Sequence, residues 1–208
     1  MHGEELVTPR TPPVVRLAQH DEWKSLGALL GDAFFDDPVW DWVVTNPERR
    51  RKHLGTFLGH VIHSKVRSGT VWTTTEREGA AVWAAPGDWK VHPVKMLPAL
   101  PSAVRCVGVR DLHARLGALA KMEEGHPTEP HWYLELLAAH YDLRGKGVGT
   151  ALISPMLERC DSEGLPTYLE SSKAENLPFY HRFGFEVTEE VSIARGCSPI
   201  WRMWREPR

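Results

Sequence analysis

Alternating glycines at the junction of an apolar run and an amphipathic run limit what this chain can fold into. Residues 131–139 are largely apolar and predict a central strand, whereas residues 150–163 carry apolar side chains at helical spacing. The junction reads Arg144-Gly145-Lys146-Gly147-Val148-Gly149. Glycines there leave room for a ligand at the backbone, and the helix that follows points unpaired N–H groups and its positive dipole end at it. The segment therefore predicts an anion-binding turn.

Two common phosphate-binding turns do not match this spacing. A P-loop is excluded because Lys146 is followed by Gly147 and no glycine stands at position 140 or 141. A dinucleotide-binding turn fits better, since Glu170 lies about twenty residues further on, where an acid would bind the ribose. However, Thr150 takes the place of the third glycine, and residues 140–144 separate the strand from the first one. A plain flexible turn is the remaining alternative.

Strand and helix patterns alternate along the rest of the chain and predict one α/β domain over residues 14–208, after a loose polar tail at residues 1–13. Strands are expected at residues 14–18, 70–74, 80–84, 131–139, 166–170, 185–188 and 199–204, with the second and third forming an antiparallel hairpin. Helices are expected at residues 21–34, 47–66, 150–163 and 174–183, with an apolar cluster at 39–44 and a proline-interrupted helical stretch at 89–124.

Local signals predict how two of these helices begin. Asp21 can cap the first helix, and Pro47 can occupy the first turn of the next long helix. The basic run Arg49–Lys52 is expected to be a solvated face. Three histidines at positions 53, 60 and 63 share that helix, but no Cys, Asp or Glu joins them at ligand spacing, so no metal is expected.

Charge and cysteine content exclude several kinds of partner. The 208 residues carry a formal net charge of -2, so no strong field attracts nucleic acid or an anionic membrane. No apolar run is long enough to span a bilayer, and the first residues lack the basic and apolar blocks of a signal peptide. The cysteines, Cys106, Cys160 and Cys197, suit neither a disulfide framework nor a zinc site and predict a reducing, cytoplasmic compartment.

Two segments resemble one enzyme superfamily. The glycine turn matches the Gln/Arg-x-x-Gly-x-Gly/Ala coenzyme A signature of the GNAT acetyltransferases, and Leu136-Leu137-Ala138-Ala139 resembles the strand that precedes it. The segment from Asn176 to Phe185 is similar to the superfamily's late helix-to-strand motif, and from Glu129 onward the chain looks closest to puromycin N-acetyltransferase-like members. The resemblance implies an α/β (α+β) GNAT fold, in which helices cover both faces of a mixed, mostly antiparallel sheet. This sheet would be splayed between residues 131–139 and 166–172, with acetyl-CoA in the gap.

The resemblance also implies which residues hold acetyl-CoA. Asn176 would contact the pantetheine arm, the strand backbone its amides, and the glycine turn the pyrophosphate. Tyr180 would supply a proton to the departing thiolate or hold its charge. The implied coenzyme-binding set is Leu137, Ala138, Ala139, Arg144, Gly145, Lys146, Gly147, Val148, Gly149, Thr150 and Asn176.

Glu135 is the first candidate for a general base, because it is the lone carboxylate in an apolar strand. Strict alternation would place Tyr133, Glu135, Leu137 and Ala139 on one face of that strand. Burial would raise the pKa of this carboxyl toward the working pH. Glu135 could instead be an edge or surface acid, or a buried acid paired with an arginine. Glu170 is the second candidate, and it could instead form a structural pair. The backbone N–H of Leu137 is the expected partner for the developing oxyanion.

The acetyl acceptor is expected to meet residues far upstream. Phe35, Asp36 and Trp40 lie in an aromatic and acidic segment that can stack an apolar acceptor and attract its cationic amine, although core packing is an alternative for the aromatics. The predicted activity is direct transfer of an acetyl group to a primary amine of a small molecule. A protein lysine acceptor and a non-catalytic acyl-CoA sensor stay open, as do a monomer and a homodimer.

Overall fold

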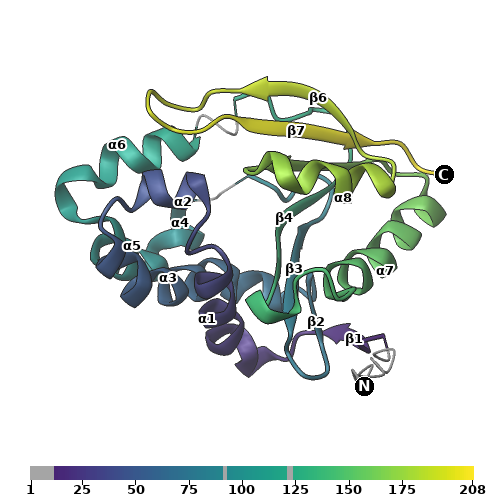
Figure 1. Ribbon diagram of the computed structural model, residues 1–208, viewed down its shortest axis with the longest axis horizontal. Helices are drawn as coiled ribbons and strands as arrows, with labels where there is room; N and C mark the ends of the chain where they lie inside the picture. The colour runs from purple at the N-terminus through teal and green to yellow at the C-terminus, as the bar shows by residue number, and fades with distance from the viewer. Residues whose placement is uncertain (1–11, 91–92, 121–123) are drawn as a thin grey trace, which may run out of the picture.

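The computed structural model describes residues 12–90, 93–120 and 124–208, and it contains a seven-stranded sheet with helices on both faces (Figure 1). The strand order is β1-β2-β3-β4-β5-β7-β6, and the β4–β5 pair is parallel while the others are antiparallel. The strands are β1 Val15–Leu17, β2 Val71–Thr74, β3 Gly79–Ala84, β4 Trp132–Ala139, β5 Thr167–Ser171, β6 Glu186–Val191 and β7 Ile200–Arg205. The predicted mixed, mostly antiparallel α/β sheet is confirmed.

The helices fall into two groups. In Figure 1, α1 to α6 gather on one side of the sheet and α7 and α8 on the other. Their bounds are α1 Trp23–Ala33, α2 Pro38–Val43, α3 Pro47–Arg67, α4 Pro93–Met96, α5 Leu100–Val107, α6 Val109–Ala120, α7 Val148–Glu163 and α8 Leu177–Arg182. Short 3₁₀ turns lie at His20–Glu22, Leu97–Ala99, Tyr141–Leu143 and Ala174–Asn176. Among the described residues, no helix is long and apolar enough to cross a membrane.

Two of the predicted helix starts are informative. Pro47 does open α3, and the Asn46 side chain caps it by accepting from the Arg49 backbone N–H at 3.0 Å. The cap predicted at Asp21 is wrong. A 3₁₀ turn comes first, and there the Glu22 carboxylate accepts from the Gln19 N–H at 2.7 Å.

Arg50 departs from the solvated face expected for the basic run on α3. Its residue is 6% exposed, and its guanidinium donates to the Val44 carbonyl at 2.8 Å and pairs with Asp41 at 2.6 Å. The guanidinium also lies over the Phe35 ring, at 4.9 Å from its centroid. A sequence run of like charges therefore does not face one way, because successive helical residues point in directions about 100° apart.

The centre of the sheet opens after a short region of parallel pairing. β4 and β5 pair only from Trp132 to Leu134, opposite Thr167 to Leu169. On the other edge of β4, Val82 faces Leu136 while Trp83 faces Leu134, so Glu135 is an extra residue with no partner on β3. Such a bulge bends the strand and sharpens its twist. The predicted splay between the two strands is confirmed, and it begins at Glu135.

The bulge changes which side chains share a face. Strict alternation predicted Leu137 and Ala139 opposite Trp132 and Leu134, and that prediction is wrong. All four pack with the apolar side chains of α7, whereas Leu136 and Ala138 pack with those of α1 and α3. One inserted residue shifts the two-residue period of a strand, so every side chain beyond it changes face.

Glycines allow α1 and α3 to pack closely, which fixes α3 against the sheet. A Cβ atom added at Gly27 would lie 2.4 Å from the Cα of Gly59, and one added at Gly31 would lie 2.4 Å from the backbone nitrogen of Gly55. Real Cβ atoms do not approach other atoms so closely. The two helices therefore meet backbone to backbone along this stripe.

We expect the Gly27→Ala substitution to lower the free energy of unfolding by about 2 kcal/mol or more, because overpacking outweighs the helix propensity of alanine. Urea denaturation measures the change. The control is Gly117→Ala on α6, where an added Cβ meets nothing within 4 Å. That variant should gain up to about 1 kcal/mol. Equal or greater stability of Gly27→Ala would contradict the close packing of the two helices.

Candidate active site

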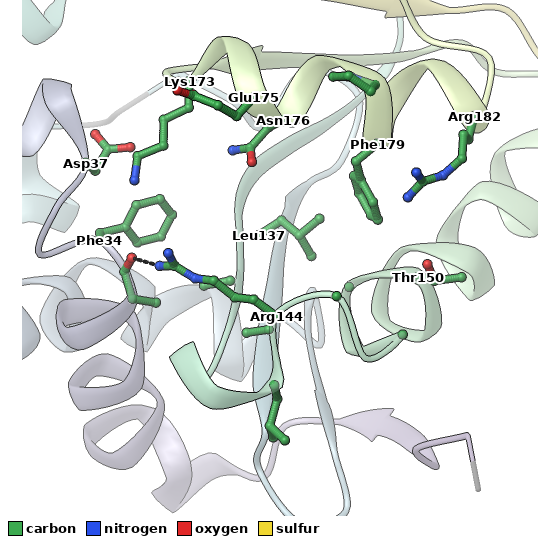
Figure 2. A pocket seen from close by; sticks show the side chains of 18 residues that line it. Phe34, Asp37, Leu137, Arg144, Thr150, Lys173, Glu175, Asn176, Phe179 and Arg182 are labelled. Atoms are coloured by element: carbon green, nitrogen blue, oxygen red, sulfur yellow. Dashed lines mark hydrogen bonds between the residues drawn. The ribbon is translucent and has the colours of Figure 1, made fainter. Parts of the chain in front are cut away.

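A cleft of about 520 Å³ lies where β4 and β5 diverge. Its floor is the open part of β4, its two ends are the turn before α7 and the start of α8, and part of its wall is the loop between α1 and α2. Figure 2 shows the side chains of this cleft, with Leu137 near the centre and basic side chains on both sides. The cleft thus joins three segments that are far apart in sequence.

The glycine turn has the conformation that the anion-binding prediction requires. Gly145 and Gly147 have φ values of 75° and 85°, in the left-handed region, and an added Cβ at either meets nothing within 4 Å. Helix α7 begins at Val148, two residues before its predicted start, so its first N–H groups lie directly after Gly147. Their open approach and the helix dipole favour a negatively charged ligand.

The structure places most of the predicted coenzyme-binding residues in the cleft. Those lining it are Leu137, Ala138, Ala139, Arg144, Gly145, Gly147, Gly149, Thr150 and Asn176. Lys146 is exposed beside the turn and is not in the lining, and Val148 is buried under it in the core. Nine of the eleven predicted residues therefore line one cleft, and Lys146 and Val148 do not.

Two cations face each other across the cleft mouth. Lys173 and Arg144 both line the cleft, and the Asp36 carboxylate lies 3.0 Å from the Lys173 ammonium and 3.7 Å from the Arg144 guanidinium. Arg144 also donates to the carbonyl of Ala33 at 2.8 Å, as the dashed line in Figure 2 marks. Lys173 and Arg144 together lower the pKa of Asp36, although burial opposes them. Asp36 therefore serves as a shared counterion for both.

Some residues near Asp36 line the cleft and others do not, and they are not the ones that the sequence singled out. Phe34 and Asp37 line the cleft, and in Figure 2 the Phe34 ring lies between the Lys173 and Arg144 side chains. Phe35 and Trp40 do not line it. Phe35 stacks under the Arg51 guanidinium at 4.8 Å, and Trp40 packs edge-on against Phe57.

Asp37 ties this loop to the end of β5. One carboxylate oxygen accepts from the backbone N–H groups of Val39 and Trp40 and so caps α2, while the other accepts from the Ser172 hydroxyl. Burial raises the pKa of Asp37. The Asp37-Pro38 pair is a helix-start signal that the sequence carried and that would have identified this role.

Glu135 forms an ion pair with a lysine that the sequence did not identify as its partner. Its Oε1 lies 2.6 Å from the Lys65 Nζ, on the last turn of α3, and the side chains are 16% and 20% exposed. Burial raises the pKa of Glu135, and Lys65 opposes this effect. Glu135 is not in the cleft lining but lies two residues from Leu137, which is. No local pattern could have pointed to Lys65, 70 positions away.

Glu170, the second candidate base, is held by two tyrosines. Its carboxylate accepts from the Tyr133 hydroxyl at 2.5 Å and from the Tyr168 hydroxyl at 2.9 Å. Burial and this carboxylate raise the pKa of both phenols, so both stay protonated as donors. The structure supports a fixed, hydrogen-bonded role for Glu170.

Aromatic rings pack together over Tyr133 of β4 and Tyr168 of β5. The His126 ring stacks on Trp89 at 3.7 Å and meets the Tyr133 and Tyr168 rings edge-on. Burial lowers the pKa of His126 to about 3, so the ring is neutral at physiological pH. The two tyrosines that hold Glu170 are thus packed against aromatic rings.

Tyr180 lies in α8, where it packs in the apolar core and is not among the residues that line the cleft. It is 8% exposed, and its ring packs edge-on against Phe179, which lines the cleft, and against Phe185. Burial raises the pKa of its hydroxyl, which therefore stays protonated at neutral pH. Over the described ranges of the chain, this hydroxyl makes no hydrogen bond. Over the same residues, no group of three or more His, Cys, Asp or Glu is placed to hold a metal.

Comparisons with known proteins agree with this geometry. The sequence model of the Acetyltransferase (GNAT) family matches residues 80–185. An uncharacterized N-acetyltransferase of Schizosaccharomyces pombe is 30% identical over 202 residues, which cover 89% of this chain and 80% of that protein. The chain therefore belongs to the GNAT family of N-acetyltransferases, which use acetyl-CoA as co-substrate.

Solved structures share the whole architecture. A Corynebacterium glutamicum structure described as histone acetyltransferase HPA2 and related acetyltransferase is 24% identical, has a TM-score of 0.69, and the match covers 95% of this chain and 98% of that one. The Drosophila melanogaster polyamine N-acetyltransferase is 15% identical, has a TM-score of 0.62, and the match covers 93% and 99% of the two chains. These likenesses confirm the GNAT fold.

Proposed function

We propose that residues 14–208 form one catalytic domain that transfers the acetyl group of acetyl-CoA to a primary amine of a small molecule. The observation that carries the proposal is the arrangement around the splay. A cation-lined cleft with an anion-binding turn opens at the gap between β4 and β5, and a partly buried carboxylate, Glu135, lies on the α3 side of the bulge where that gap begins. Donor and acceptor would then meet at the splay.

The cleft fits coenzyme A in its chemistry. The turn from Gly145 to Thr150 would hold the pyrophosphate, with Arg144 and Lys173 adding positive charge. The exposed Asn176 amide and the open backbone of Leu137 to Ala139 would bind the amides of the pantetheine arm. Arg182 at the far end offers one more cation.

Glu135 would accept the proton of the acceptor amine. An aliphatic amine has a pKa of about 10 and is mostly protonated at neutral pH, so it needs a base before it can attack. The amine nitrogen then bonds to the thioester carbonyl carbon, and the backbone N–H of Leu137 would stabilise the oxyanion. The carbon–sulfur bond breaks, and the Tyr180 hydroxyl would donate a proton to the thiolate. The second proton of the acylated nitrogen would leave to water, from which the phenolate would regain its own.

A small amine is favoured over a protein lysine by the enclosure of this region. Glu135 and Lys65 are mostly shielded, and on the same strand as Glu135 the Tyr133 ring meets His126 edge-on, which in turn stacks on Trp89. The acids Asp88 and Glu170 also act on Glu135, which suits a cationic acceptor. The similarity to puromycin N-acetyltransferase-like proteins in residues 165–180 adds aminonucleosides to the acceptors worth testing. The free thiols of Cys106, Cys160 and Cys197 suit a cytoplasmic site of action.

We expect Glu135→Gln and Tyr180→Phe each to lower kcat at least about a hundredfold, because each removes one proton-transfer group. Acetyl-CoA consumption is measured with puromycin, polyamines, arylalkylamines and lysine peptides as acceptors. Full activity in both variants would refute the assigned roles. Coenzyme binding without turnover on any amine would favour an acyl-CoA sensor, and preference for the lysine peptides would replace the small acceptor with a protein.

Asp36→Asn should tighten coenzyme A binding about two- to fivefold, because an exposed ion pair of this kind contributes roughly 0.2–1 kcal/mol and Asp36 competes for both mouth cations. Isothermal titration of coenzyme A measures the change in Kd. Asp32→Asn is the control, since this exposed acid precedes the loop on α1 and forms no ion pair among the described residues. Weaker binding by Asp36→Asn would show that Asp36 supports the site instead.

A further inference from the structure

The Lys65–Glu135 ion pair joins α3 to the bulged residue of β4, and both of its side chains are largely shielded from water. The Nζ and Oε1 atoms lie 2.6 Å apart, although the residues are 70 positions apart in sequence. Exposed side-chain fractions of 20% and 16% mean that water screens the pair weakly. An interaction of this kind is strong enough to decide the protonation state of a carboxyl group.

Backbone contacts hold the lysine in place. The Lys65 carbonyl accepts from both the N–H and the hydroxyl of Thr70, at 3.1 and 3.3 Å, which fixes the end of α3 against the start of β2. Closer to the middle of α3, Gly59 packs against Gly27 of α1 and leaves the helix little freedom to move. The ammonium therefore approaches Glu135 from a rigid support.

The remaining groups around Glu135 push its carboxyl toward the protonated form. Burial has the largest effect, and the negative charges of Asp88, after β3, and Glu170, on β5, add to it and raise the pKa of Glu135. The hydroxyl of Tyr133, on the same strand, donates a hydrogen bond to Glu170 at 2.5 Å. Lys65 is the positive group that opposes these effects. A protonated carboxyl cannot act as a base.

The two carboxylate oxygens of Glu135 differ in their hydrogen bonds. Oε1 accepts from Lys65, whereas Oε2 makes no hydrogen bond with any residue in the described ranges. One oxygen is therefore anchored, and the other is open to an amine or to a water that relays its proton. Anchoring one oxygen also fixes the direction in which the other points.

We propose that Lys65 is a positioning residue for the reaction: its ammonium keeps Glu135 ionised at neutral pH and orients the open carboxylate oxygen toward the acceptor. This inference rests on the proposed role of Glu135 as the base. Without the lysine, Glu135 holds its proton to higher pH, so the fraction of enzyme with a competent base falls at neutral pH and recovers as the pH rises. The activity that a Lys65 variant loses at neutral pH should therefore return at alkaline pH.

The first test needs no acetyl acceptor. Glutamate labelled with ¹³C at the side-chain carboxyl is followed by NMR from acid to alkaline pH, and Glu135→Gln assigns the signal. We expect Lys65→Met to raise the midpoint of Glu135 by about one unit or more. Lys65→Arg keeps the charge and should restore most of the shift. Lys52→Met, which removes an exposed charge from the same helix, should change nothing. An unchanged midpoint in Lys65→Met would overturn the inference.

Kinetics then separates this inference from the proposed function. With an amine that the wild-type enzyme acetylates, Lys65→Met should lower kcat/KM about twofold or more at pH 7, should lower it further at more acid pH, and should move the acid limb of the pH profile upward, with Lys65→Arg near wild type. Full activity of Glu135→Gln would refute the base itself. An inactive Glu135→Gln beside an unshifted Lys65→Met profile would refute only the role of Lys65.

Discussion

The strands β4 and β5 stop pairing after Leu134 and Leu169, and the rest of the site depends on that separation. Backbone groups that leave a ladder need new partners, so an opened sheet is stable only where side chains, turns or a ligand satisfy them. Here the gap is closed at one end by rings around Tyr133 and Tyr168 and lined at the other by the turn before α7. The cleft exists because β5 pairs with only the first part of β4.

The bulge at Glu135 gives the opening its two chemically different sides. Beyond it, Leu137 and Ala139 turn toward α7, while Glu135 meets Lys65 of α3 on the other side. The proposed base and the side chains that face α7 are therefore separated by the backbone of β4. The glycine contact between α1 and α3 helps to position groups on both sides of the opening. It fixes the helix that carries Lys65 and the loop that carries Asp36 and Asp37.

Local signals predicted the parts of this structure that depend on backbone conformation. Gly145 and Gly147 had to be glycine because their φ values are positive, and Pro47 marked the start of α3 for a similarly local reason. The bulge could not be predicted, because register depends on how β3 aligns with β4. Lys65 and the counterion role of Asp36 depend on tertiary contacts between segments with no pattern in common.

The central claim is that coenzyme A binds in the splay with its pyrophosphate at the glycine turn. The most direct measurement is a crystal structure of the protein with coenzyme A. We expect pyrophosphate oxygens at the backbone N–H groups between Gly145 and Thr150, and the pantetheine arm along Leu137 to Ala139 with its sulfur directed toward Tyr180. A coenzyme bound elsewhere, or a sulfur far from both Tyr180 and the bulge at Glu135, would contradict it.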